Sequence, residues 1–390
     1  MNVNNEIIYK TPEEILSVHD KQEWIHLALS CDNLYAFYQS PDWWQYSLNV
    51  MLRDHILRLR YGGDPVIAQI VGNDGTLAGM TGAFASNYLL NFKFKSRTLS
   101  IFNISAIRLM GGQPLVKNDE AIYIELVKTL FEKFPNCDAI HIPWVPIGSN
   151  CWNNIHKSNE LSQVAKVYVP DKDYAKHFSI TLDQSFDGYL QKFNKKARYN
   201  LKREVKILDS HCHDQLCMVR IEQANDVKMF LDAAVKVSSK SWQHELEPQM
   251  DNSLDERRRY EQFANQGVLR CYLLRCGETA CAFVRGFQFG GVYYYSRIGF
   301  DEKFKKFSPG KVLFYLMLED LHSYNKPNRL NFQEGDYEYK RSFANSCIET
   351  ADILLMRYDA DIKSKTAIAV HKLFNSSVIY MKKILALKRA

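Results

Sequence analysis

The chain has 390 residues, of which 46% are hydrophobic and 13% aromatic, so it can form two or three domains with substantial cores. This composition excludes global disorder. The formal net charge of +6 is carried by residues 362–390, which hold seven Lys or Arg residues and no Asp or Glu. A globally basic nucleic-acid-binding domain is therefore excluded as well.

The first part of the chain predicts one compact α/β unit over residues 1–165. A helix is expected over 13–29, because Thr11-Pro12 can open it, and a shorter helix begins at Ser40-Pro41. The spacing of apolar residues predicts an amphipathic helix over 119–134. Strands are predicted over 55–61, 66–71, 77–85, 98–104 and 139–144, with a hairpin turn at Asn73-Asp74-Gly75.

A second unit with the same order of elements is predicted over residues 166–360. Its helices are expected over 185–192, 193–208, 226–239 and 253–266, and its strands over 178–182, 219–221, 269–275, 279–289 and 292–298. Another helix begins at Ser308-Pro309 and ends at Pro327, before a strand over 329–332. Residues 361–390 predict a basic amphipathic helix. The fold class is therefore α/β (α+β), with two similar domains in tandem and mixed, mostly antiparallel sheets flanked by helices.

Residues 292–340 have the pattern of an anion-binding site. A strand is followed by a basic loop with Lys303, Lys305 and Lys306, and then by Ser308-Pro309-Gly310-Lys311 at a helix N-terminus. Free N–H groups and the positive end of the helix dipole can bind phosphate there, and glycine lets the backbone approach closely. The plainer alternative is an ordinary helix N-terminus with solvated lysines.

Four stretches of the chain carry a resemblance to a known family. They are FDEKFKKFSPGK (300–311), NFQEGDYEYKRSF (331–343), FNKKARYNLKREVK (193–206) and the weaker SSKSWQ (238–243). In this order and spacing, the chain resembles the BioF2-like, CelD-type acyltransferases of the GNAT superfamily, which are related to the FemABX aminoacyltransferases. The resemblance covers residues 178–357 well and 24–148 loosely, the latter through YQSPDWW (38–44).

The resemblance implies two tandem GNAT-like domains, of which the first is non-catalytic and lies on the acceptor side, and the second is catalytic. It implies acyl-CoA, such as acetyl-CoA, as co-substrate and no metal. The cofactor-binding residues would be Tyr294, Arg297, Phe307, Ser308, Pro309, Gly310, Lys311 and Lys340.

Acyl transfer from a thioester needs an activated acceptor and a proton for the leaving thiolate. Tyr339 can supply that proton, and His244 or Glu245 can act as general base. Related sequences carry an acid where this chain has Asn331, which cannot act as a base. The resemblance places Trp242 near the acceptor, and Lys196, Arg198 and Asp336 are further candidates for binding the substrate. The plainer alternatives are that Trp242 is a core residue and that residues 335–340 form a surface helix whose charges are paired.

The predicted helix over 193–208 carries six basic residues on one arc: Lys195, Lys196, Arg198, Lys202, Arg203 and Lys206. This arc is either a solvated face or a contact with an anionic acceptor, a cofactor phosphate or tRNA. Only Phe193 and Tyr199 could stack on bases, which argues against RNA.

The cysteine pattern predicts neither a disulfide framework nor a zinc site. Nine cysteines are scattered along a chain whose first residues, MNVNNEIIYK, lack the features of a secretory signal, so we expect reduced and buried thiols. His211, Cys212, His213 and Cys217 lack the paired spacing of a structural zinc site. Cys271, Cys276 and Cys281 are expected as small buried residues on strands.

The function predicted from these features is acyl-CoA-dependent N- or O-acylation of a sugar, polysaccharide or cell-envelope precursor. One alternative is a FemABX-like transferase that uses aminoacyl-tRNA. Another is a non-catalytic protein that binds an anionic glycan or a membrane-linked assembly. No apolar run approaches the ~18 residues of a membrane span, so we expect a cytoplasmic protein. The tail, residues 361–390, either docks on the body or makes peripheral contact with the inner face of the membrane.

Overall fold

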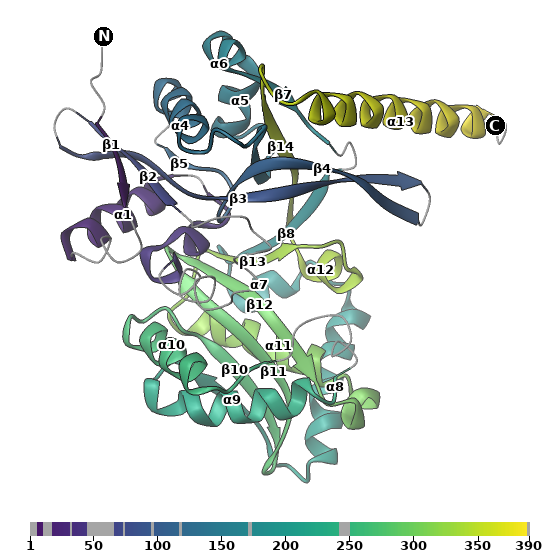
Figure 1. Cartoon of the computed structure of the whole chain (residues 1–390). Coiled ribbons are helices and arrows are strands. Elements are labelled where there is room, and N and C mark those ends of the chain that lie inside the picture. Colours follow the sequence, from purple (N-terminus) through teal and green to yellow (C-terminus); the bar gives the residue numbers. More distant parts are fainter. Residues whose placement is uncertain are drawn as a thin grey trace. The chain divides into compact units, whose positions relative to one another are not determined.

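The computed structural model describes residues 6–10, 18–31, 33–44, 66–72, 75–94, 97–116, 119–170, 174–241 and 250–387. The chain divides into two units, of which the first comprises residues 1–175 and 348–390, and the second comprises residues 176–347. Each unit is a twisted sheet flanked by helices, as predicted for tandem GNAT-like domains (Figure 1). The predicted strand over 55–61 lies outside the described residues.

The sheet of the first unit runs in the order β1-β2-β3-β4-β6-β14. All neighbours in it are antiparallel except β4 and β6, which are parallel and are joined through helix α4. Parallel neighbours need such a crossover connection. The strands are β1 Glu6–Lys10, β2 Val66–Val71, β3 Leu77–Phe94, β4 Arg97–Leu109, β5 Leu115–Val116, β6 Ala139–Pro146, β7 Ala165–Tyr168 and β14 Ser346–Arg357.

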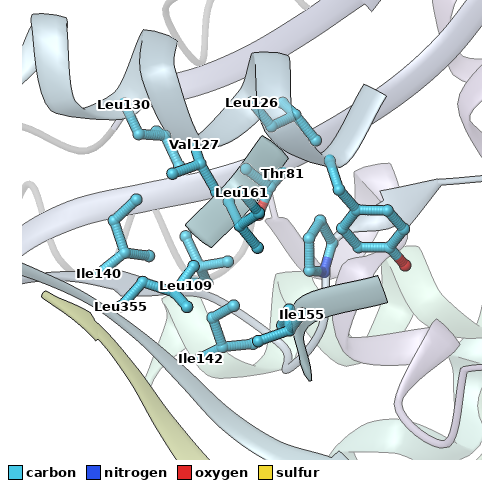
Figure 2. A pocket seen from close by; sticks show the side chains of 12 residues that line it. Thr81, Leu109, Leu126, Val127, Leu130, Ile140, Ile142, Ile155, Leu161 and Leu355 are labelled. Carbon is cyan, nitrogen blue, oxygen red and sulfur yellow. The ribbon is translucent and has the colours of Figure 1, made fainter. Parts of the chain in front are cut away.

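Helices cover this sheet with apolar side chains. They are α1 Val18–Ser30, η2 Ala36–Gln39, α4 Glu120–Lys133, α5 Asn150–Lys157, α6 Asn159–Val164 and α13 Ile362–Leu387. The inner face of α4 meets β6 and α5 around a small cavity whose lining is almost wholly apolar, including Leu126, Ile140 and Ile155 (Figure 2). A void with such an apolar lining is part of the packing of the core. It offers no favourable hydrogen-bonding environment to a polar ligand.

The sheet of the second unit runs in the order β9-β10-β11-β12-β13-β8. Only β12 and β13 are parallel, and helix α11 joins them. The strands are β8 Ala175–Thr181, β9 Leu216–Ile221, β10 Cys271–Cys276, β11 Thr279–Phe289, β12 Val292–Phe300 and β13 Arg329–Glu334. The helices are α7 Phe186–Leu190, α8 Lys195–His211, α9 Ala224–Ser238, α10 Leu254–Asn265, η4 Glu302–Phe307, α11 Pro309–Ser323 and α12 Glu338–Phe343.

The two units share one plan, but the chain does not divide where the sequence predicts. In each unit four antiparallel strands precede a helix and a parallel strand, and a sixth strand closes the sheet: β14 in the first unit and β8 in the second. The predicted boundaries at 165 and 360 are therefore wrong, because β14 returns after the whole second unit to pair with β6. Ile353, for example, pairs with Ile142.

The predicted tail helix is α13, and its first half packs on its own unit. Ala367 and Ile368 are buried in one cluster with Leu90 and Phe92 of β3. Leu373 and Tyr380 are exposed at 70% and 67%. Among the described residues, no helix combines the length and apolar character needed to cross a membrane.

Candidate functional site

The candidate site of the second unit begins where β12 and β13 separate. Their parallel pairing ends at Tyr294 and Asn331. Beyond that pair Gln333 adopts a left-handed conformation (φ 60°), and its N–H donates to Oδ1 of Asn331 at 2.7 Å. Gln333 Nε2 then donates to the carbonyl oxygen of Tyr295 at 3.4 Å, so side chains replace the backbone ladder. The two strands therefore separate directly after Tyr294 and Asn331.

The N-terminus of α11 follows β12 and has no side-chain cap. Ser308 is in the left-handed region (φ 53°, ψ 48°), and no side-chain oxygen accepts from the first turn. Pro309 has no N–H, and the N–H of Gly310 has no hydrogen-bond partner among the described residues. The corresponding helix of the first unit, α4, is closed by Asp119, which accepts from two backbone N–H groups. Only α11 of this pair is open to an anion.

The lysines around α11 are not equivalent. Lys311 donates to Glu204 of α8 at 2.9 Å and Lys305 pairs with Glu302, so both are partly neutralised. Lys303 and Lys306 are exposed and have no carboxylate partner within the described part of the chain. Phe307 stacks on His211, with ring centroids 4.1 Å apart. Lys303 and Lys306 are thus the cations with the most freedom to meet a phosphate.

Tyr339 lies in the first turn of α12, after the end of β13. It is half-buried, and its ring packs edge-on against Phe332 of β13 at 6.0 Å. It also lies close enough to Tyr295 of β12 that, after burial, it contributes to raising the pKa of that phenol well above its ordinary value. Tyr339 is therefore held beside both of the strands that separate.

The two charged residues predicted beside Tyr339 have different surroundings. Lys340 is buried at 5% exposure, and its Nζ donates to the carbonyl oxygen of Glu334 at 2.6 Å. Asp336 is paired with Arg341. At the other end of α12, Lys192 Nζ donates to the carbonyls of Phe343 and Ala344 at 2.7 and 2.5 Å, which satisfies the last carbonyls of the helix and fixes it.

Two of the predicted cofactor-binding side chains are placed away from an open surface. Tyr294 is fully buried, so it can contribute only its backbone to a ligand. Arg297 is half-buried opposite Arg285 of β11. The two predicted substrate-binding residues of α8 differ: Lys196 is exposed, whereas Arg198 donates to Gln191 and to the carbonyl oxygen of Phe193. Trp242, His244 and Glu245 lie outside the described residues.

His177 belongs to this site although its sequence context gave no signal for it. It lies on β8 opposite Glu334 and is exposed at only 2%. Burial, and then the charge of Lys340, lower the pKa of its imidazole from 6.5 to about 4. His177 is therefore neutral at neutral pH, and Lys340 carries the charge of this buried pair.

The second unit should lose stability as the pH falls from 6.5 to 4. Below pH 6.5 the unfolded chain binds a proton at His177, whereas the folded chain does not until about pH 4, so the free energy of unfolding falls by about 3 kcal/mol over this range. Hydrogen exchange of β8 and β13 peptides at a series of pH values measures the loss.

His177→Gln removes the titrating group and should flatten that slope. His213→Asn is a matched control, because His213 is an exposed, left-handed residue (φ 52°) in the same unit and asparagine tolerates that conformation. An unchanged slope in His177→Gln would contradict the assignment.

The expectation that every cysteine is reduced is wrong at one pair. Cys212, at the C-terminal end of α8, forms a disulfide with Cys276 at the end of β10, with the Cα atoms 5.0 Å apart. The pair is separated by 64 residues, and only the packing of α8 on the sheet brings it together. Cys271 and Cys281 are buried thiols, whereas Cys217 is exposed. No group of three or more His, Cys, Asp or Glu residues suited to a metal occurs in the described ranges.

One family model matches a part of the second unit. Residues 195–341 match the family model described as an acetyltransferase (GNAT) domain. The match includes β12, the N-terminus of α11, β13 and most of α12. Most of the second unit is thus similar to a GNAT acetyltransferase domain.

Solved structures share the fold over most of the chain. A crystal structure of FemX superposes with a TM-score of 0.58 at 12% identity, covering 90% of this chain and 97% of that one. A conserved protein of unknown function from Bacteroides thetaiotaomicron superposes with a TM-score of 0.54 at 14% identity, covering 90% and 100%. No curated protein matches the sequence. At these identities the likeness extends to the fold alone.

Proposed function

We propose that this chain is an acyl-CoA-dependent acyltransferase of the BioF2-like, CelD-type branch. The pyrophosphate of the donor would bind at the N-terminus of α11. Its pantetheine arm would follow β12, where this strand leaves β13. The acceptor would be an amine or hydroxyl of a sugar, polysaccharide or cell-envelope precursor.

The observation that carries this proposal is the contrast between α11 and α4. The two helices occupy the same place in their units, each joining the parallel strands. At α4, Asp119 uses its carboxylate to occupy the first N–H groups, and Glu120 follows it. At α11 the N–H of Gly310 is open, and Lys303 and Lys306 lie in the preceding turn. The first N–H groups and the helix dipole favour a phosphate at α11 and disfavour one at α4.

In the proposed reaction the acceptor attacks the thioester carbonyl carbon, and the carbon–sulfur bond then breaks. The electron pair of that bond stays on sulfur as the CoA thiolate. Tyr339 donates its phenolic proton to the thiolate, the acceptor releases its own proton to solvent, and Tyr339 is reprotonated from solvent. A tyrosine can fill this role, because its ordinary pKa of ~10 keeps the hydroxyl protonated and able to donate at neutral pH.

Placing a carboxylate at the cap of α11 tests the phosphate site. Ser308→Asp would recreate the situation at Asp119 of α4, and repulsion should weaken CoA binding about tenfold or more, since 1.4 kcal/mol corresponds to a factor of ten. Ser308→Asn is the matched control, because asparagine has the same shape, tolerates the left-handed conformation and is neutral. Isothermal titration calorimetry of the full chain with CoA measures both variants.

The proposal fails if wild-type chain does not bind CoA, or if Ser308→Asp and Ser308→Asn bind it equally well. A second candidate is an aminoacyl-tRNA-dependent transferase, and the likeness to the FemX fold is compatible with it. It is favoured by the five exposed basic residues of α8, which are Lys195, Lys196, Lys202, Arg203 and Lys206. It predicts no CoA binding and a steep salt dependence of tRNA binding.

We retain peripheral membrane contact as part of the proposal for the tail. The exposed Leu373 and Tyr380 of α13, together with its lysines, support this placement at the inner face of a membrane. A purely non-catalytic role in binding an anionic glycan would be indicated by the absence of CoA binding and of thiol release.

A further inference from the structure

The first unit has a polar cluster at the place where its own parallel strands separate. The pairing of β4 with β6 ends at Arg108 and His141, just as the pairing of β12 with β13 ends at Tyr294 and Asn331. A left-handed residue follows in both units, Trp144 (φ 55°) in the first and Gln333 in the second. The two locations are equivalent in the fold, but the one in the first unit carries charged side chains.

His141 and Asp352 form the base of this cluster. His141 is exposed at 3%, and its Nε2 donates to Oδ2 of Asp352 at 3.0 Å. The other carboxylate oxygen of Asp352 accepts the backbone N–H of Trp144 at 3.1 Å. Asp352 lies at an irregularity of β14, between its pairs Ala351–Val145 and Ile353–Ile142. Both oxygens of Asp352 are therefore used within the protein.

Because Nε2 faces a carboxylate, Nε2 carries the hydrogen and Nδ1 is left as an acceptor in the neutral ring. Nδ1 has no hydrogen-bond partner among the described residues. Burial, opposed by Asp352 and reinforced by Arg108, lowers the pKa of His141, so the neutral ring is the relevant form. A ligand that meets His141 would have to present a hydroxyl or an amine hydrogen.

Arg108 supplies the positive charge. Its guanidinium lies 5.9 Å from the centroid of the Trp144 ring and close enough to Asp352 to act on its charge. In the described part of the chain, however, the guanidinium has neither a hydrogen bond nor an ion pair. Arg357 of the same unit, by contrast, donates to Asp359 and to the carbonyl oxygen of Phe131. A half-buried guanidinium without an acceptor is costly unless a ligand provides one.

We propose that Arg108, His141 and Trp144 form a second ligand site, which binds an oxyanion next to a hydroxyl or amine. Arg108 binds the carboxylate or phosphate oxygens, His141 Nδ1 accepts from the neighbouring hydroxyl or amine, and the Trp144 ring supports the guanidinium. Asp352 is a positioning residue, because it fixes the ring of His141 and the backbone of Trp144. This site is independent of the donor assigned to the second unit.

Chemical protection of Arg108 tests the site without any assay of activity. The full chain is treated with phenylglyoxal, and modification of each arginine is followed by peptide mass spectrometry. Sodium phosphate, propionate and lactate are added in separate arms, with sodium chloride at matched ionic strength as the reference. An anion present at ten times its dissociation constant should slow modification of Arg108 about tenfold. The engaged Arg357 should react slowly in every arm.

Each outcome decides a part of the proposal. Protection by phosphate alone or by the carboxylates alone supports the site and identifies the source of the oxyanion. Lactate carries a hydroxyl that propionate lacks, so it should protect better, and His141→Phe should remove that advantage while leaving protection by propionate. No protection by any anion, or equal effects at Arg108 and Arg357, overturns the site. Equal protection by lactate and propionate overturns the role of His141.

Discussion

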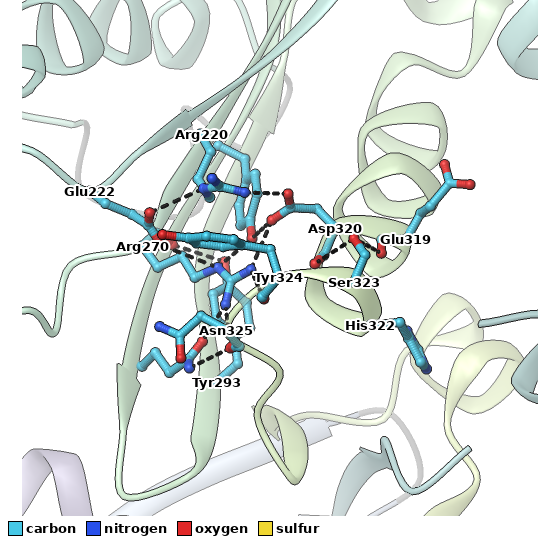
Figure 3. A network of polar contacts seen from close by, with 12 residues as sticks. Arg220, Glu222, Arg270, Tyr293, Glu319, Asp320, His322, Ser323, Tyr324 and Asn325 are labelled. Atoms are coloured by element: carbon cyan, nitrogen blue, oxygen red, sulfur yellow. Dashed lines mark hydrogen bonds and ion pairs between the residues drawn. The ribbon is translucent and has the colours of Figure 1, made fainter. Parts of the chain in front are cut away.

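Replacing Asp320 by alanine should destabilise the second unit more than any other single exchange considered above. Asp320 lies near the end of α11, where its Oδ2 accepts from Arg270 at 2.8 Å and from the Tyr272 hydroxyl at 2.7 Å (Figure 3). Its Oδ1 accepts from Arg220 at 2.5 Å. Asp320→Ala leaves these donors without this acceptor and leaves Arg270, exposed at 1%, with Glu222 at 3.6 Å as its remaining carboxylate partner among the described residues. Breaking such a buried pair costs about 3–5 kcal/mol.

The other contacts of Arg270 explain why its guanidinium cannot easily move to a new acceptor when Asp320 is lost. Its remaining N–H groups already donate to Tyr272, Gln288 and the carbonyls of Tyr324 and Asn325. The guanidinium therefore joins β10, β11 and the end of α11 in one network, which fixes the helix that begins at the candidate phosphate site. Loss of Asp320 should accelerate hydrogen exchange in peptides from α11 and β10.

Asp232→Ala is the matched control. Asp232 also has three polar partners, Lys228, Asn252 and Arg257, but its side chain is 30% exposed. Exposed ion pairs contribute about 1 kcal/mol or less, so its loss should be mild. Equal destabilisation by the two substitutions would show that burial of the Arg270 network is not what stabilises this unit. Hydrogen exchange is the suitable measurement, because a chain of two units need not unfold in a single step.

Local patterns in the sequence were sufficient to predict the helices and strands, but not to predict which strands pair with one another. Apolar periodicity and turn residues placed α4, α11 and β12 close to their observed bounds. The same patterns could not show that β14 pairs with β6, because pairing across the whole intervening unit leaves no local trace. The domain boundaries were therefore predicted wrongly even though the strands and helices were mostly right.

The same distinction applies to the candidate site: features set by neighbours in sequence could be predicted, and contacts between distant residues could not. The start of α11 at Pro309 depends on neighbours in sequence, and it could be predicted. The burial of Lys340 beside His177 could not, because it arises from β8, which precedes it by more than a hundred residues. The Asp352–His141 contact joins residues 211 positions apart, and the Cys212–Cys276 disulfide joins residues 64 positions apart. Spacing rules do not detect pairs at such separations.

Tyr339→Phe should reduce release of CoA about a hundredfold, which is a typical contribution of a positioned acid. The ring of Tyr339 packs against Phe332, and phenylalanine can keep that contact. Only the hydroxyl is lost, so the thiolate must leave without a proton from the protein. The measurement uses acetyl-CoA with hydroxylamine as a small acceptor and subtracts the reaction without protein.

Tyr337→Phe controls for the loss of a tyrosine hydroxyl as such. Tyr337 is 56% exposed and stacks on Tyr339 at 6.1 Å, so the control removes a hydroxyl from the neighbouring tyrosine. CoA should be quantified by chromatography, because a thiol reagent would also react with the exposed Cys217 and Cys347. Equal turnover of Tyr339→Phe and the wild-type chain would remove Tyr339 from the mechanism. The thiolate would then have to leave without a proton from this residue, while a CoA site at α11 could still be correct.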